Sequence, residues 1–140
     1  MRTQYQATVD IDVPFHDVDS YRVVWHGNYA RYFEIARCKL LDLMGVNYGA
    51  METMGFLFPV VDMQTKFVRA LVFGQRVRVT ATLMSWRYKL EIRYRIVDSE
   101  TGALLTKGKT SQVAITPEGQ LQYPAPQALV EAIETFLSRQ

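Results

Sequence analysis

Alternating apolar and polar positions predict strands in three parts of the chain. Residues 76–83 and 89–96 each place an apolar side chain at every second position, with arginine, lysine, threonine or glutamate between them. Residues 4–13 alternate in the same way until Pro14 stops the pattern. A period of two is typical of a strand with one buried face and one wet face. These runs therefore predict an antiparallel sheet that is covered on one side.

Two further strands follow from composition and turn signals. Residues 56–72 are rich in aromatic and β-branched side chains, and residues 103–115 form another apolar run. Turn-forming residues occupy 99–102 and 116–119. Strands joined by short turns pair antiparallel, because parallel pairing needs long crossover connections.

The period becomes helical at Asn28. An apolar stripe with three-and-four spacing follows, comprising Tyr29, Tyr32, Phe33, Ala36, Leu40 and Leu43. The polar residues fall mostly on the opposite side: Arg31, Arg37, Lys39 and Asp42. Asn28 is expected to cap the start of this helix, and Gly45 is expected to end it in a left-handed conformation.

A short terminal helix is predicted after Pro126, with one apolar face made of Leu129, Ile133, Phe136 and Leu137. The predicted order is thus strand, long apolar helix, about four long strands and a short helix. A helix with so wide an apolar stripe has to be wrapped by the sheet. The fold class predicted is α+β, with a curved antiparallel sheet around one central helix.

Composition restricts the class of protein. The chain has 140 residues with 49% hydrophobic and 21% charged, which fits one globular domain over 1–140. Its single cysteine, Cys38, excludes an internal disulfide framework, and a net charge of +2 does not indicate a nucleic-acid binder. No apolar run approaches the roughly 20 residues of a membrane span, and residues 1–12 lack a signal-peptide core. A soluble, cytoplasmic protein is expected.

Candidate chemistry is concentrated in residues 16–29. This segment contains Asp17, Asp19, the chain's two histidines (His16 and His26) and several aromatic residues, and it leads into the main helix. The start of a helix presents unpaired N–H groups and partial positive charge, which would polarise a carbonyl placed there. A carboxylate just upstream would act on that carbonyl as nucleophile or general base. The residues alone therefore favour acyl transfer or hydrolysis.

The same residues resemble a known family. The pattern Asp17-Val18-Asp19, the run from Val23 to Tyr29, and the helix residues 31–37 are similar to hotdog-fold acyl-CoA thioesterases. The branch that it resembles contains 4-hydroxybenzoyl-CoA thioesterase and the thioesterases associated with the Tol-Pal system. Downstream similarity over residues 66–79 extends the resemblance to most of the chain.

The resemblance implies a hotdog fold and hydrolysis of acyl-CoA or acyl-carrier-protein thioesters at sites between the subunits of a homodimer or homotetramer. CoA would be part of the substrate and product, with no separate cofactor and no metal. The implied roles are a catalytic carboxylate at Asp19, carbonyl-polarising backbone N–H groups at His26 and Gly27, and substrate contacts from Trp25, Tyr29 and Glu34. Asp17 matches an acidic position that does not react.

One departure from the family concerns the loop after Asp19. The branch commonly has one or two glycines before its valine pair, whereas this chain has Ser20-Tyr21-Arg22. Glycine allows backbone angles that a side chain resists. Tyr21 and Arg22 are therefore expected to reshape the acyl pocket or to place a charge at its mouth.

Plainer alternatives stand beside each role. Asp19 could be a turn former. His26 could be a general base or a solvent-facing side chain, although we favour a role for its backbone. Glu34 could form a surface ion pair with Arg31 or Arg37. Tyr29 could belong only to the core. Candidates for the CoA phosphates are Arg69, Arg87, Lys89, Lys107 and Lys109, among which the pattern does not choose.

Two other functions remain open. The first is a hotdog dehydratase acting on hydroxyacyl thioesters, which would need a histidine and a carboxylate around one pocket. The second is a protein that binds acyl thioesters without hydrolysing them, in which the loop that lacks the glycines does not support catalysis.

Overall fold

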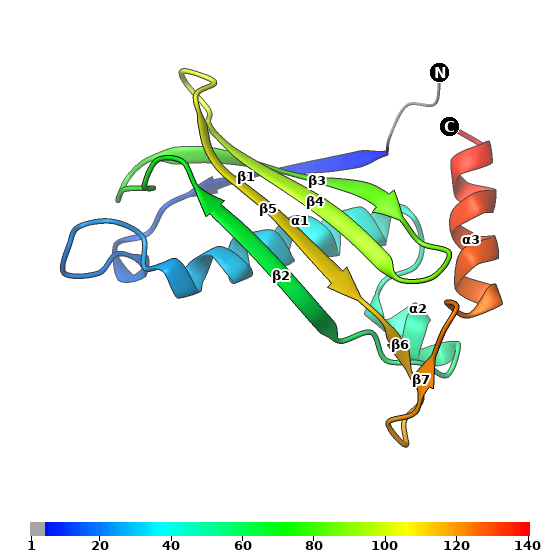
Figure 1. Cartoon of the computed structure of the whole chain (residues 1–140). Helices are drawn as coiled ribbons and strands as arrows, with labels where there is room; N and C mark the ends of the chain where they lie inside the picture. Colours follow the sequence, from blue (N-terminus) through cyan, green and yellow to red (C-terminus); the bar gives the residue numbers. More distant parts are fainter. Residues whose placement is uncertain (1–4) are drawn as a thin grey trace.

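One five-stranded antiparallel sheet forms the body of the protein (Figure 1). The computed structural model describes residues 5–140, so Gln4, the first residue of the expected N-terminal strand, lies outside them. In spatial order the strands are β1 (Gln6–Asp12), β3 (Arg76–Ser85), β4 (Leu90–Asp98), β5 (Leu104–Gln112) and β2 (Val60–Phe67). The predicted strand 56–72 is shorter than expected, because only its middle pairs with β5.

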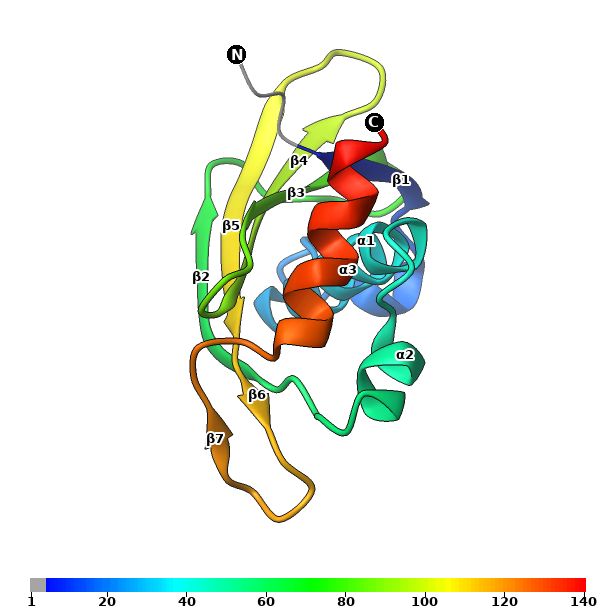
Figure 2. The ribbon, with the colours of Figure 1, turned by 90° about the vertical axis from the view of Figure 1, so that its right-hand side faces the viewer.

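The long helix α1 (Tyr29–Leu43) lies across one face of this sheet, which curls around it (Figures 1 and 2). The predicted alternation is confirmed, since every second position from Val77 to Leu83 in β3 and from Leu90 to Ile96 in β4 is buried on the helix side. Gly45 has a φ of 74° just after α1, as predicted for the helix end. The α+β architecture expected from the sequence is therefore confirmed.

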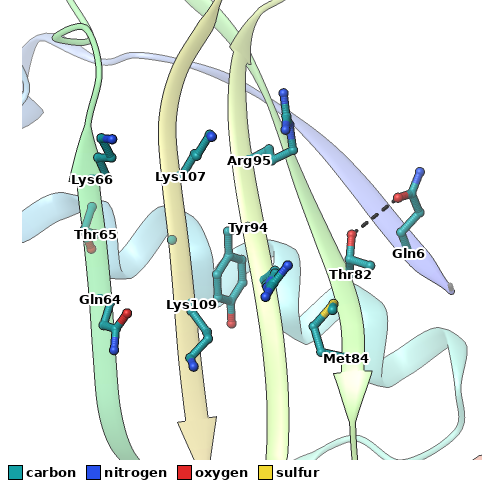
Figure 3. Close-up of a pocket in the computed structure, with 12 residues that line it drawn as sticks. Gln6, Gln64, Thr65, Lys66, Thr82, Met84, Tyr94, Arg95, Lys107 and Lys109 are labelled. Carbon is teal, nitrogen blue, oxygen red and sulfur yellow. Dashed lines mark hydrogen bonds between the residues drawn. The ribbon is translucent and has the colours of Figure 1, made fainter.

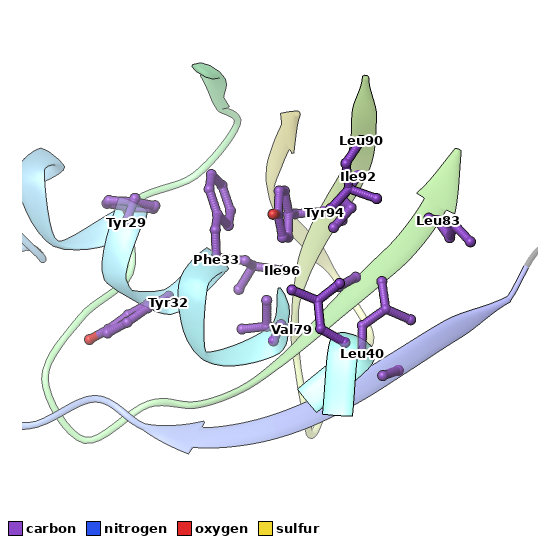
Figure 4. Close-up of a cluster of buried hydrophobic side chains, with 14 of the residues drawn as sticks. Tyr29, Tyr32, Phe33, Leu40, Val79, Leu83, Leu90, Ile92, Tyr94 and Ile96 are labelled. Atoms are coloured by element: carbon purple, nitrogen blue, oxygen red, sulfur yellow. The ribbon is translucent and has the colours of Figure 1, made fainter. Parts of the chain in front are cut away.

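Packing between α1 and the sheet depends on a stacked aromatic pair (Figure 4). The rings of Phe33 and Tyr94 lie 4.5 Å apart at an angle of 15°. Gly108 on β5 allows this arrangement, because a Cβ at that position would lie 2.4 Å from the Cζ atom of Phe33. The absence of a side chain there lets α1 approach the centre of the sheet.

Three expectations about α1 are wrong. Arg37, expected on the polar side, is buried, and its guanidinium donates to the hydroxyls of Tyr48 (2.7 Å) and Tyr94 (3.2 Å). Leu43, expected in the buried stripe, is 48% exposed. Asn28 does not cap the helix, since its side-chain amide donates to the carbonyl of Asp17. For Arg37 and Asn28, a partner distant in sequence decides the side chain's position.

Smaller elements complete the chain. The short helix α2 (Tyr48–Thr53) and the strand β7 (Leu121–Gln122) were not predicted, whereas β6 (Ala114–Ile115) is the end of the strand predicted over 103–115 and the predicted turn at 116–119 joins it to β7. The terminal helix α3 (Gln127–Ser138) was predicted, and it packs at one end of the sheet through Leu129 and Ile133. Within residues 5–140, no helix has the length and apolar character needed to cross a membrane.

Candidate active site

Asp17 is the anchor of the loop that precedes α1. It ends the 3-10 turn η1 (Phe15–Asp17) and is only 2% exposed. The hydroxyl of Tyr32 donates to its Oδ2 atom at 2.6 Å, and the guanidinium of Arg31 forms an ion pair with the same oxygen. The Nε2 atom of His16 lies 3.5 Å from Oδ1. Two side chains of α1 therefore hold a carboxylate that comes from the loop.

Electrostatics keep this carboxylate ionised. Burial raises the pKa of Asp17, but the hydrogen bonds from Tyr32 and Arg31, together with the charge of Arg31, outweigh burial and lower the pKa below its usual range. Burial and the neighbouring carboxylate raise the pKa of Tyr32. Tyr32 thus stays protonated and continues to donate its hydrogen bond.

The backbone of Asp17 closes the loop onto the start of the helix. Its carbonyl accepts hydrogen bonds from the N–H of Trp25 and from the side-chain amide of Asn28, both at 2.9 Å. The side chain and the carbonyl of one residue therefore fix both where the loop begins and where the helix begins.

Asp19 lies in a tight hairpin that directly follows Asp17 in the chain. Val18 and Val24 form an isolated β-bridge at its base, and the N–H of Asp19 donates to the carbonyl of Val23 at 2.9 Å. Oδ1 of Asp19 accepts from the N–H of Tyr21 at 2.8 Å. Oδ2 accepts no hydrogen bond from any residue between 5 and 140. Asp19 is a turn residue, as the plainer alternative holds, and it also keeps one carboxylate oxygen free.

Arg22 closes this hairpin in a conformation that favours glycine. Its φ is 68°, and it is the one residue other than glycine in the left-handed region within 5–140. Its N–H donates to the carbonyl of Asp19 at 2.9 Å. The loop thus keeps the backbone shape that a glycine would give, although the sequence places a side chain there.

The start of the helix is the short turn η2 (His26–Asn28), which runs directly into α1. Its first hydrogen bond joins the N–H of Asn28 to the carbonyl of Trp25 at 2.9 Å. The N–H groups of His26 and Gly27 precede that bond and have no partner within the helix. The ring of Trp25 lies directly over Gly27, where a Cβ would be 2.3 Å from it. The side chain of His26 is exposed.

Tyr29 connects the start of α1 to the end of β2. It is 2% exposed; its hydroxyl accepts from the N–H of Leu71 at 3.3 Å, and its ring meets that of Phe67 edge-on at 4.8 Å. Phe67 itself is 51% exposed. Tyr29 is therefore a core residue that borders an exposed aromatic surface beside the hairpin.

The other predicted residues lie farther from this region or are differently engaged. Glu34 is exposed on α1, and the expected surface ion pair is not formed, since Arg31 binds Asp17 and Arg37 is buried. Arg69 follows Phe67 and precedes Leu71, both of which contact Tyr29, so it lies near the start of α1.

The remaining candidates for the CoA phosphates lie elsewhere. Arg87 and Lys89 lie within the β3–β4 turn near α3, where Arg87 pairs with Glu134 at 3.0 Å. Lys107 and Lys109 lie on the face of the sheet opposite α1, which is behind the sheet in Figure 3. The sequence pattern could not distinguish Arg69 from the other four candidates. Only the folded sheet shows that the five residues lie on different faces and at different ends of the sheet.

Sequence reasoning missed the partners of Asp17. Arg31 was assigned to a solvated face and Tyr32 to the core stripe, so nothing linked them to a loop carboxylate. Residues 5–140 contain no group of three or more His, Cys, Asp or Glu side chains arranged to hold a metal ion.

Comparison with known proteins identifies the family. The model of the thioesterase-like superfamily matches residues 13–133. The "Putative esterase sll0410" of Synechocystis sp. is 32% identical over 131 residues, covering 92% of this chain and 79% of that protein.

Solved structures agree. The DHNA-CoA thioesterase of Staphylococcus aureus has a TM-score of 0.83 at 25% identity, covering 95% of this chain and 91% of that chain. The hypothetical protein TT1821 from Thermus thermophilus has a TM-score of 0.81 at 29% identity, covering 93% and 98%. The chain belongs to the thioesterase-like superfamily. This membership confirms the family and hotdog fold that the sequence resembled, and with them an enzyme of the thioester-hydrolase class.

The left-handed backbone of Arg22 predicts a stability change. Replacing Arg22 with glycine should raise the free energy of unfolding by about 0.5–1 kcal/mol, because the strain of a side chain at this φ exceeds the added entropy of glycine in the unfolded chain. Arg22→Ala is the matched control and should give no gain, since it keeps the Cβ. Urea unfolding measures both. An equal gain in the two variants would assign the effect to the arginine side chain instead.

Proposed function

We propose that the protein hydrolyses acyl-CoA thioesters and that Asp19 is the reacting carboxylate. The observation that carries this proposal is the division between two neighbouring aspartates. Asp17 is buried, with Tyr32 and Arg31 on its carboxylate, whereas Asp19 is half-buried in a hairpin with its Oδ2 atom free. A carboxylate oxygen without a competing partner is the one able to reach a substrate.

The chemistry follows from that free oxygen. Asp19 attacks the thioester carbonyl carbon, the C–S bond breaks, and CoA leaves as a thiolate that takes a proton from solvent. Water then hydrolyses the acyl–Asp19 anhydride and restores the carboxylate. In the alternative path, Asp19 accepts a proton from a water molecule that attacks the same carbon. Both paths release a free acid and a thiol.

The start of α1 can stabilise the negative charge that develops on the carbonyl oxygen of the thioester. The N–H groups of His26 and Gly27 precede the first hydrogen bond of the helix, and the helix dipole adds partial positive charge there. Such donors stabilise the developing oxyanion. Trp25 covers Gly27 and would border the bound thioester, with Tyr29 beneath it. For Glu34 we retain only a place at the mouth of the acyl pocket.

The proposed substrate class is a CoA thioester. The name of the staphylococcal relative gives that protein a CoA thioester substrate, and Arg69 supplies a cation near the start of α1 for the CoA phosphates. An acyl-carrier protein remains the competing thiol carrier. The dehydratase and the non-hydrolysing binding protein gain no support from the contacts around His26 or Asp19.

A second copy of the chain would complete this site. The side of β2 that faces α1 is uncovered and apolar, with Val61 58%, Met63 48% and Phe67 51% exposed. β2 is also an edge strand with an unpaired row of backbone groups. We infer a homodimer in which two β2 strands meet, so that the partner closes the acyl pocket beside Phe67 and Tyr29.

The two aspartates should give opposite results when each is changed to asparagine. Asp19→Asn should lower kcat for thiol release from acyl-CoA by about 100-fold or more, with the free energy of unfolding close to that of wild type. Asp17→Asn should instead lower the free energy of unfolding by about 2 kcal/mol, because its charged hydrogen bonds to Arg31 and Tyr32 are lost.

The substrates for this assay are short, long and aromatic acyl-CoAs, with the matching acyl-carrier-protein thioesters in parallel. Full turnover by Asp19→Asn would contradict the proposed role of Asp19 as the reacting carboxylate. Binding of acyl-CoA by wild type without any thiol release would favour the non-hydrolysing alternative, and hydration of an enoyl thioester would revive the dehydratase.

The proposed dimer is tested on β2. Met63→Lys should convert the dimer to a monomer and reduce thioesterase activity in parallel, because a charge would be buried in an apolar contact. Asp62→Lys, on the same strand but facing the other side of the sheet, is the control and should change neither property. Light scattering gives the mass, and thiol release gives the activity. An active monomeric Met63→Lys would show that one chain holds a complete site.

A further inference from the structure

A cluster of positive charge lies on the face of the sheet opposite α1, which we call the outer face (Figure 3). A pocket of about 720 Å³ on this face is lined by cations from three strands: Lys66 of β2, Arg93 and Arg95 of β4, and Lys107 and Lys109 of β5. Polar side chains from the same face, including Gln64 and Thr82, complete its lining. The proposed thioester chemistry uses none of these residues, because the sheet separates them from α1.

The strand register sets like charges directly opposite one another. Lys107 is the partner of both Lys66 and Arg95, and Arg93 is the partner of Lys109. Neighbouring strands are about 4.8 Å apart, so Lys66, Lys107 and Arg95 form a row roughly 10 Å long. Like charges in such positions repel and destabilise a sheet. This arrangement costs stability unless an anion offsets it.

In the part of the chain that the structure describes, none of these five cations forms an ion pair with a carboxylate. Elsewhere on the sheet cations are paired, as Arg78 is with Asp10 at 3.0 Å and Lys89 is with Glu91 at 3.6 Å. Within residues 5–140, none of the five lies within 4.0 Å of a carboxylate oxygen. The carboxylates of this face, Asp62 and Glu91, lie beside Gln64 and Lys89 at its edge, so the five cations adjoin one another without a carboxylate between them.

We propose that the outer face binds a small anion that carries several phosphate groups. The pocket has the volume of a small-molecule site, and a row of closely spaced cations matches adjacent phosphates. The guanidinium groups of Arg93 and Arg95 bind phosphate oxygens in pairs, and the second amide hydrogen of Gln64 offers a further hydrogen bond. A second copy packed here would set these cations against their equivalents, which disfavours self-association through this face.

The test is isothermal titration calorimetry with inorganic tripolyphosphate at about 50 mM salt, where screening is moderate. Wild type should bind, and the affinity should fall as salt rises. The double variant Arg95→Gln/Lys107→Gln should bind at least tenfold more weakly. The matched control is Arg78→Gln/Lys89→Gln, which removes the same charge from paired cations and should bind like wild type. Thiol release should be unchanged in both double variants.

A parallel titration with adenosine 3′,5′-bisphosphate tests whether the site also accepts phosphates carried by a nucleotide. Binding of either compound that is lost only in Arg95→Gln/Lys107→Gln supports the site. No binding by wild type, or equal weakening in both double variants, would overturn it. Binding of single-stranded RNA but not of either small anion would also overturn it, because the occupant would then be a macromolecule.

Discussion

The contact between Asp17 and the first turn of α1 is the constraint on which the site depends. A buried carboxylate loses its hydration, and that loss is tolerated only where charged and hydrogen-bonding partners replace water. Arg31 and Tyr32 supply those partners, and both come from the helix that the sheet holds in place. The carbonyl of Asp17 then binds Trp25 and Asn28. One residue thereby fixes the hairpin of Asp19 and the N–H groups at the helix start relative to each other.

The sheet makes this anchor rigid. The ring of Phe33, one residue after Tyr32, stacks on Tyr94 and lies against Gly108, so the first turns of α1 cannot shift without disturbing the core. The proposed catalysis would benefit from such a frame, because donors that are already in position need no reorganisation when charge develops on the substrate. The same sheet separates two chemically different surfaces, a site beside α1 and a cationic patch on the outer face. Each surface therefore has its own electrostatic character.

Periodicity predicted the parts of the fold that repeat. The alternation in β3 and β4 and the stripe of α1 were sufficient for the architecture, since burial of one face determines those patterns. What periodicity cannot show is a contact between residues far apart in sequence. Arg37 is buried because the hydroxyls of Tyr48 and Tyr94 accept hydrogen bonds from its guanidinium. The helix α2 forms in a segment where no hydrophobic pattern predicted a helix. Similarly, resemblance to the family indicated Asp19, but only the fold shows that Asp17 is engaged. The missing glycines predicted an altered loop, yet Arg22 keeps the glycine-like backbone.

The central claim, that Asp17 holds the loop and leaves Asp19 free, is tested by the free energy of unfolding between about pH 3 and pH 7. The pKa of Asp17 is lowered in the folded protein, so its stabilisation is complete above the unfolded value of about 4 and is lost as pH falls through the folded value. Wild type and Asp19→Asn should therefore lose stability in acid alike. Asp17→Asn should be less stable at pH 7 and decline less steeply, with a residual slope from Asp10 and Asp98, whose pKa values are lowered by hydrogen bonds from Arg78 and Gln75. A flattened profile in Asp19→Asn and an unchanged one in Asp17→Asn would contradict the account.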